Sequence, residues 1–326
     1  MASLPPSDYL VDRRQLRRKL SFWRVAAILC LIVAVVVAGT RLIGTNAGKF
    51  TPHIARLSIS GLITGDRKTL TLIHDIGEAK NVSAVLVSIE SPGGTTTGAE
   101  RLYDALRKLS AKKPTVAVVG TLAASGGYIA AIGTDEIFSR GNSIVGSIGV
   151  LVQYPNVAKL LDKIGVSVEA IKSSPLKASP DGYEPTSPEA RAAIASLVND
   201  SFEWFKALVK ERRKMSDQEL AAVDDGRIFT GRQGIGLKLV DKIGGEQEAV
   251  TWLEQERGIH KGLPIRDWTA NKSLGSLGIL GVSARLAEWS GFSELSRTLD
   301  YGQSLSDTRL LDGLVSIWQF DSPQGN

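Results

Sequence analysis

The feature of this 326-residue sequence that most constrains its fold is a regular alternation of apolar runs with amphipathic segments. Runs such as "VSAVLVSIESPGG" and "PTVAVVG" are rich in Val and Ile, which is typical of strands buried on both faces. Between them, "TTTGAERLYDALRKLS" has apolar residues at helical spacing, with threonines available to cap the helix. Apolar strands separated by helices predict an α/β fold with a mixed or parallel sheet flanked by helices.

The same patterns predict further elements along the chain. We expect a strand in "HIARLSISGLI", a long amphipathic helix from Ser187 to Lys214 and another helix in "EQEAVTWLEQERG". Further strands are expected in "TDEIFS", "SIVGSIGVLVQY" and "VSVEAIKS", with a helix in "NVAKLLDKIG". Strand signals become sparse past about residue 262, so the sequence indicates one domain over 53–262 and a C-terminal extension over 263–326.

An uncharged run from Val25 to Thr40 lies near the N-terminus, bracketed by Arg24 and Arg41. Together with the apolar residues on either side it approaches the roughly 20 residues that cross a bilayer. No clear small-residue cleavage site follows the run before Arg41. We therefore expect an uncleaved transmembrane helix over 22–44, with a cleaved signal peptide as the alternative.

The charge distribution sets the expected orientation of this anchor. The first 24 residues carry a net charge of +4 out of +5 for the whole chain, so the remainder is nearly neutral. The positive-inside rule then places a basic tail over 1–21 in the cytoplasm, and a linker over 45–52 and all that follows outside it. The basic composition indicates a membrane-flanking tail and no nucleic-acid surface. The single cysteine, Cys30, lies inside the apolar run, which excludes an intrachain disulfide and a Cys-based metal site.

Three glycine-rich segments follow strand-like runs and are expected to be turns: "SPGG" (91–94), "ASGG" (124–127) and "GSIG" (146–149). Functional sites of α/β sheets gather where such turns meet, at the carboxyl ends of strands. Glycine lets backbone N–H groups approach a ligand closely, and two converging N–H groups can form an oxyanion hole. Each segment taken alone is equally well explained as a tight turn.

The stretch "GTLAASGGYIAA" (120–131) places the hydroxyl of Ser125 before a Gly-Gly pair, a setting typical of a nucleophile. The three histidines, His53, His74 and His260, have no companion pattern that marks a catalytic base. A lysine can serve instead when burial lowers its pKa toward neutrality. The loop "IKSSPLKASP" offers Lys172 and Lys177, and the residues alone do not choose between them.

Taken together, the motifs resemble the signal peptide peptidase A type of serine protease, in peptidase family S49. The resemblance covers about 53–260 and rests on "SPGG", "GTLAASGGYIAA", "VGSIGV", "IKSSPLKASP" and "GRIFTGRQGIGLKLVDKIGG", all in the family's order. It implies a Clp-protease/crotonase-like fold for this domain. By position, Ser125 matches the nucleophile and Lys177 the general base of a Ser-Lys dyad. Ser147 matches the residue that orients that lysine.

The resemblance also implies that Gly93, Gly94 and Gly126 form the oxyanion-hole region. The lysine loop departs from the family's usual pattern at Pro175 and Leu176, where an aromatic residue often precedes the base. Only one copy of the Ser- and Lys-containing segments is present, as in the short form of the family. That form implies a ring- or bowl-shaped homo-oligomer whose sites may be completed by neighbouring chains.

For function, the resemblance implies an endopeptidase of the bacterial inner membrane, with its catalytic domain on the extracytoplasmic side. Its expected substrates are remnant signal peptides and other unstructured apolar peptides, and it needs no cofactor and no metal. Two alternatives remain open: a crotonase-type acyl-CoA enzyme, which also uses glycine amides for an oxyanion, and a non-catalytic membrane scaffold of the same fold. The predicted anchor and the Ser-Gly-Gly turn favour the peptidase.

Overall fold

The computed structural model describes residues 22–29, 31–32, 51–269 and 315–317. The predicted tail over 1–21, much of the anchor and most of the C-terminal extension lie outside these residues. The chain divides into two units, one up to Pro52 and one from His53 onward. In the first unit, residues 22–29 and 31–32 are helical. No helix among the described residues is both long and apolar enough to cross a membrane, so the anchor over 22–44 stays a prediction.

The second unit is built on a mixed sheet whose main strands run in the order β6-β5-β3-β2-β1-β8. The neighbours in this series pair in parallel except β5 and β6, and β4 branches from β3 to pair with β7. The strand bounds are β1 His53–Ile63, β2 Val82–Thr95, β3 Thr115–Ala124, β4 Glu136–Ser139, β5 Ile144–Gly146, β6 Ile228–Thr230, β7 Lys242–Ile243, β8 Ile265–Trp268 and β9 Val315–Ile317. The α/β fold with a mixed, helix-flanked sheet is thus confirmed.

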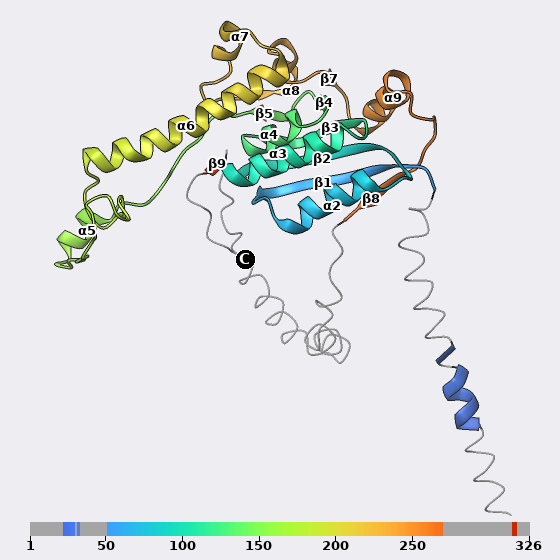
Figure 1. Ribbon diagram of the computed structural model, residues 1–326, viewed down its shortest axis with the longest axis horizontal. Helices are drawn as coiled ribbons and strands as arrows, with labels where there is room; N and C mark the ends of the chain where they lie inside the picture. The colour runs from blue at the N-terminus through green and yellow to red at the C-terminus, as the bar shows by residue number, and fades with distance from the viewer. Residues whose placement is uncertain (1–21, 30, 33–50, 270–314, 318–326) are drawn as a thin grey trace, which may run out of the picture. The chain divides into compact units, whose positions relative to one another are not determined.

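Helices cover both faces of this sheet (Figure 1). Along β2, Val85, Val87 and Ile89 belong to one core, whereas Ala84 and Leu86 belong to another on the opposite face. The first core also contains residues of α2, α3, α4 and α6, and the second contains residues of α9. The helix bounds are α2 Arg67–Glu78, α3 Thr96–Ser110, α4 Gly126–Ile132, α5 Ala158–Lys163, α6 Pro188–Arg213, α7 Asp217–Ala221, α8 Gly231–Gly236 and α9 Glu246–Glu256. Two-sided burial explains why β2 and β3 are continuous apolar runs.

The "SPGG" segment is part of a strand and not the turn that the sequence predicts. Strand β2 continues through it to Thr95, whose side chain accepts a hydrogen bond from the Gly98 N–H and caps α3. The ladder with β1 shifts register between Ser60 and Leu62, next to the residues that pair with Gly93 and Gly94. A Cβ on Gly94 would lie 1.9 Å from the Ile63 carbonyl oxygen. The glycines here permit a close backbone contact between two strands.

Helix α4 is fixed at both ends by side chains and backbone from distant elements. Arg212, near the end of α6, donates to the Ile132 and Thr134 carbonyls at distances of 2.8 and 2.9 Å. The hydroxyl of Tyr128, a completely buried residue, donates to the Leu239 carbonyl at 3.0 Å. Both contacts satisfy polar groups that burial would otherwise leave unpaired. The helix that follows Ser125 is therefore rigidly placed on the sheet.

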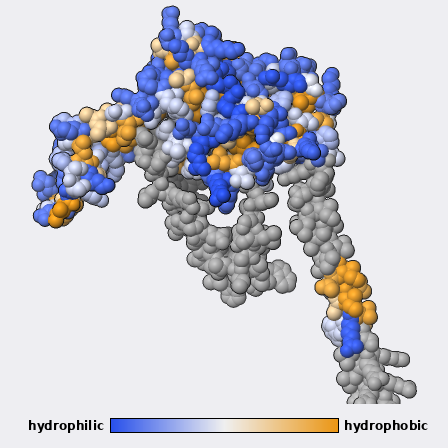
Figure 2. Space-filling model, in the orientation of Figure 1, coloured by the Kyte–Doolittle hydropathy of each residue, from blue (hydrophilic) through white to orange (hydrophobic). Residues whose placement is uncertain are grey.

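Residues 150–186, called here the lysine segment, contribute little to either core. Helix α5 has no buried residue, and the predicted strand in "VSVEAIKS" is absent from this described segment. Large apolar side chains are exposed instead, namely Leu160, Ile164, Val166, Val168, Ile171 and Leu176. Figure 2 shows hydrophobic side chains at the surface of this part of the molecule. A period-two pattern needs a partner strand to become a ladder, and the described residues supply none here.

The sheet also extends past the predicted domain end at residue 262. Strand β8 pairs in parallel with β1, from Ile54 opposite Ile265 to Leu57 opposite Trp268. The four residues are too few to give a clear alternation pattern in the sequence. Part of the predicted extension over 263–326 therefore belongs to the sheet.

We predict that Gly94→Ala destabilises the protein by roughly 3 kcal/mol or prevents folding, because a methyl group cannot fit against the Ile63 carbonyl. Gly236→Ala is the matched control, since Gly236 ends α8 and a Cβ there meets nothing within 4 Å. That change should leave stability equal or raise it by up to about 1 kcal/mol. Chemical denaturation followed by circular dichroism measures both, and equal midpoints would contradict the prediction.

Candidate active site

Ser125 lies where β3 ends and α4 begins, at the carboxyl end of a central strand. Its backbone has φ 54° and ψ −116°, and only 1% of the residue is exposed. A non-glycine residue in such a sparsely populated region costs roughly 1–3 kcal/mol and is a feature of functional sites. The turn predicted in "ASGG" is present.

Backbone hydrogen bonds hold Ser125 in this conformation. Its N–H donates to the Gly146 carbonyl at 2.8 Å, and its carbonyl accepts from the N–H groups of Tyr128 and Ile129 at 2.9 and 3.0 Å. The side-chain hydroxyl donates to the Gly149 carbonyl at the long distance of 3.5 Å. The nucleophile candidate is thus joined to the "GSIG" segment through both its backbone and its side chain.

Ser147 is the second strained serine and lies beside the first. Strands β3 and β5 pair in parallel with Ala124 opposite Gly146, so Ser125 and Ser147 each follow directly from a paired position. Neighbouring strands are about 4.8 Å apart, which makes these two residues neighbours. Ser147 has φ 53° and donates its N–H to the Arg227 carbonyl at 2.8 Å. The structure therefore brings together the two serines that the sequence singles out.

Positive φ is otherwise rare outside glycine. Five non-glycine residues have it among those the structure describes, and two of them, Lys214 and Lys238, lie at the ends of helices, where it is ordinary. The other three are Ser125, Ser147 and Ala178, which follows Lys177 in the chain. Unusual backbone conformations thus occur at or beside all three residues of the predicted catalytic set.

The glycines of "ASGG" and "SPGG" are in backbone-to-backbone contact. A Cβ on Gly126 would lie 3.2 Å from both the Gly93 Cα and the Gly94 nitrogen. A Cβ on Gly127 would lie 2.6 Å from the Ser91 carbonyl oxygen, closer than real side chains come. The start of α4 therefore packs directly on the last residues of β2. The three predicted oxyanion-hole glycines are adjacent in space.

Among these glycines the N–H groups are not equivalent. The Gly93 N–H donates to the Ser91 hydroxyl at 3.1 Å, and that hydroxyl donates in turn to the Gly61 carbonyl at 2.7 Å. The Gly126 N–H belongs to the first turn of α4, where N–H groups have no acceptor within the helix. Gly126 is thus better suited than Gly93 to bind an oxyanion. Sequence reasoning gave Ser91 no role, although it is the first residue of "SPGG".

A cavity of about 390 Å³ opens next to Ser147. Its walls are mostly apolar, with Asp224 and Asp225 at one side, and include Gly149, the acceptor for the Ser125 hydroxyl. The apolar lining residues are Ile148, Val150, Leu151, Val198 and Phe202. The volume is sufficient for a side chain of a peptide or a small ligand.

The two candidate lysines differ in their surroundings. Lys172 forms an ion pair with Asp181 at 3.0 Å, and the hydrogen bond in this pair raises the pKa of Lys172 and so holds it charged. Lys177 is exposed, and its amine makes no hydrogen bond or ion pair with any described residue. The described chain does not bring Lys177 to Ser125. A charged, paired lysine is a poor base, which favours Lys177 over Lys172.

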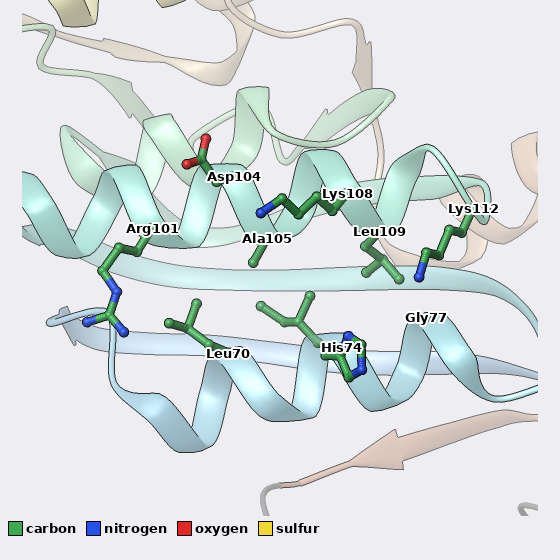
Figure 3. A pocket seen from close by; sticks show the side chains of 10 residues that line it. Leu70, His74, Gly77, Arg101, Asp104, Ala105, Lys108, Leu109 and Lys112 are labelled. Carbon is green, nitrogen blue, oxygen red and sulfur yellow. The ribbon is translucent and has the colours of Figure 1, made fainter.

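The histidines do not lie at this site. His53 begins β1 and accepts a hydrogen bond from Trp268 Nε1 at 3.0 Å, so it lies at the amino ends of the parallel strands. His260 is exposed in the loop after α9. His74 lines a groove of about 360 Å³ between α2 and α3, together with Arg101 and Lys108 (Figure 3). None of the predicted catalytic residues lines that groove.

Metal chemistry has no evident place here. Within the ranges that the structure describes, no group of three or more His, Cys, Asp or Glu side chains is arranged to hold a metal ion. The geometry instead supplies one buried hydroxyl, a second hydroxyl beside it and closely packed glycine amides. Such a set can perform nucleophilic attack on a carbonyl and stabilise the resulting oxyanion.

Comparisons with known proteins agree with this chemistry. A sequence profile described as "Peptidase family S49" matches residues 107–260, which include Ser125, Ser147 and Lys177. A protein of Synechocystis sp. named "Putative protease slr0021" is 37% identical over 207 residues, covering 63% of this chain and 75% of that protein.

Two further relatives bear related names. One from Enterococcus faecium, "Putative signal peptide peptidase SppA", is 29% identical over 258 residues, covering 75% of this chain and 74% of the relative. The "Serine protease SPPA, chloroplastic" of Arabidopsis thaliana is 28% identical over 204 residues, which are 62% of this chain and 30% of that longer protein. On the family match and the Synechocystis relative, this chain is a peptidase of family S49.

Proposed function

We propose that the protein is a membrane-anchored serine endopeptidase in which Ser125 is the nucleophile and Lys177 the general base. The observation that carries this proposal is the pair of strained serines, Ser125 and Ser147, at the paired carboxyl ends of β3 and β5. The glycines at the end of β2 pack against them. This combination places a hydroxyl nucleophile beside closely packed backbone N–H groups.

In the proposed reaction, Ser125 Oγ attacks the carbonyl carbon of a peptide bond while Lys177 Nζ takes its proton. The Gly126 N–H and a second amide from the glycine segments stabilise the negative oxygen of the tetrahedral intermediate, an effect worth about 3 kcal/mol per donor. Lys177 then returns the proton to the leaving amine, and an acyl-enzyme remains. A water molecule that gives a proton to Lys177 hydrolyses the ester and restores Ser125.

Ser147 is the proposed positioning residue for the lysine. It adjoins Ser125, and its backbone is held by the hydrogen bond to the Arg227 carbonyl. A hydroxyl in that position can accept a hydrogen bond from a lysine amine and hold it toward Ser125. Orientation of this kind is the role of the third member in catalytic triads.

We further propose that Lys177 reaches Ser125 from a neighbouring copy of the chain. The lysine segment leaves six large apolar side chains exposed, and soluble surfaces rarely leave such patches uncovered. A second copy that covers them would also remove water from the Lys177 amine, as a neutral lysine requires. Self-association through this segment accounts for both features, and it agrees with the ring- or bowl-shaped homo-oligomer expected from the sequence.

The expected substrates are remnant signal peptides and other unstructured apolar peptides. The apolar cavity beside Ser147 supports this expectation, because it would accept an apolar side chain. A membrane anchor over 22–44, with the catalytic unit outside the cytoplasm of a bacterial cell, would keep the site near such peptides. Family membership favours this assignment over the acyl-CoA alternative.

Ser125→Ala should lower kcat/KM for an unstructured apolar peptide by at least about 1,000-fold, because the nucleophile is lost. Ser58→Ala, at an exposed position on β1, is the control and should leave activity unchanged. Gel filtration should show the same assembly for both variants. Full activity of Ser125→Ala would refute the assignment, and would leave the scaffold alternative untouched only if the wild type were inactive.

The two lysines can be distinguished in the same assay. Lys177→Ala should inactivate the enzyme, whereas Lys172→Ala should retain activity, since Lys172 is bound to Asp181. Circular dichroism serves to verify that both variants are folded. Loss of activity in Lys172→Ala with an active Lys177→Ala would show that the base was assigned wrongly.

Mixing subunits tests whether the lysine comes from a neighbour. Ser125→Ala and Lys177→Ala chains, each inactive alone, are unfolded together in equal amounts and refolded. If each site joins a serine of one copy to a lysine of another, random assembly restores roughly a quarter of wild-type activity. A mixture that stays inactive, while refolded wild type recovers, would show that both residues act within one chain.

A further inference from the structure

The C-terminal part of the chain forms a strand on the candidate active site. Residues Val315–Ile317 make β9, which pairs antiparallel with the end of β2. In this register Ile317 lies opposite Gly93, Ser316 opposite Gly94 and Val315 opposite Thr95. The extension over 263–326, for which the sequence gave no role, therefore contacts the very segment that contains two of the predicted oxyanion-hole glycines.

The position of β9 relative to Ser125 follows from contacts already described. Gly126 packs on the Gly93 Cα and the Gly94 nitrogen, so the residue after the nucleophile abuts the same two residues that β9 pairs with. Because Ile317 is opposite Gly93, the chain beyond Ile317 continues from the Gly93 end of the contact. A backbone in this place lies next to the Ser125 hydroxyl.

An extended peptide added to a strand is a general mode of peptide recognition. Main-chain hydrogen bonds supply affinity regardless of sequence, and pockets for alternate side chains supply specificity. A peptidase acting on unstructured chains needs such a sequence-tolerant contact. The end of β2 offers it, and the cavity beside Ser147 is available for a side chain.

We propose that Gly93–Thr95 is the strand on which peptides bind, and that the chain's own segment around Val315–Ile317 occupies it and competes with substrate. This inference rests on the proposed function, since the competitor is defined by the substrate that it displaces. The occupant is joined to the catalytic unit through residues 269–314, which connect β8 to β9.

The tether makes a weak contact effective. A linked segment has an effective concentration on the order of millimolar, so a tail that binds with a Kd of about 0.3 mM raises the apparent KM about fourfold. Turnover of bound substrate is unchanged, because the competitor must leave before substrate binds. The predicted signature is thus a change in KM at constant kcat.

The test uses the full chain with the ladder disrupted by proline, which has no N–H to donate. Alternate residues of a strand direct their N–H groups to the same neighbour, so one of Ser316 and Ile317 donates toward β2. The variant Ser316→Pro with Ile317→Pro removes both N–H groups. The matched control, Ser316→Ala with Ile317→Val, keeps them. On an unstructured fluorogenic peptide, the proline variant should have a KM about fourfold lower than the control, with kcat within twofold.

A binding measurement separates this inference from the peptidase proposal. Both variants are also made in the Ser125→Ala background, and a fluorescent peptide with the sequence of residues 311–322, "LDGLVSIWQFDS", is titrated by anisotropy. The peptide should bind the proline variant about fourfold more tightly than the control. If no chain cleaves peptide but this difference holds, the docking strand stands and the peptidase proposal fails. Equal KM and equal binding in proline variant and control would overturn the docking strand while cleavage continues.

Discussion

The structure depends on one contact between backbones: the first residues of α4 lie directly against the last residues of β2. Any side chain at Gly127 would meet the Ser91 carbonyl at 2.6 Å, and any at Gly94 would meet the Ile63 carbonyl at 1.9 Å. Such closeness lets a helix N-terminus and a strand end present their N–H groups to one point. Tyr128 and Arg212 fix the other end of α4, so the contact cannot relax by a shift of the helix.

Desolvation links catalysis to assembly in the proposed enzyme. Ser125 is buried by its own chain, but Lys177 is exposed, so the two halves of the dyad differ in what surrounds them. A lysine in water is protonated at neutral pH and cannot act as a base. In the proposed oligomer, the surface that covers the lysine segment also makes its amine basic enough to act. An isolated chain would carry a correctly shaped nucleophile without its base.

Sequence patterns predicted what depends on local order and on two-sided burial. The apolar runs of β1, β2 and β3, the helices α3, α6 and α9, and the turn at Ser125 were all predicted from periodicity and glycine placement. Patterns failed where a neighbour decides. "SPGG" looks like a turn but pairs as strand, because β1 shifts register to accommodate it, and "VSVEAIKS" alternates like a strand but has no partner. The choice of Lys177 came from family resemblance, and its support came from the ion pair of Lys172, which composition does not reveal.

The hydrogen bonds that strain the two serines have a consequence for the timing of folding. Ser125 is held by the Gly146 carbonyl and Ser147 by the Arg227 carbonyl, so each depends on chain that is synthesised later than itself. A nascent chain that ends before Arg227 lacks the second of these restraints. The reactive geometry is therefore assembled late, when most of the catalytic unit has already emerged from the ribosome, and the growing polypeptide has no complete cutting site during its own synthesis.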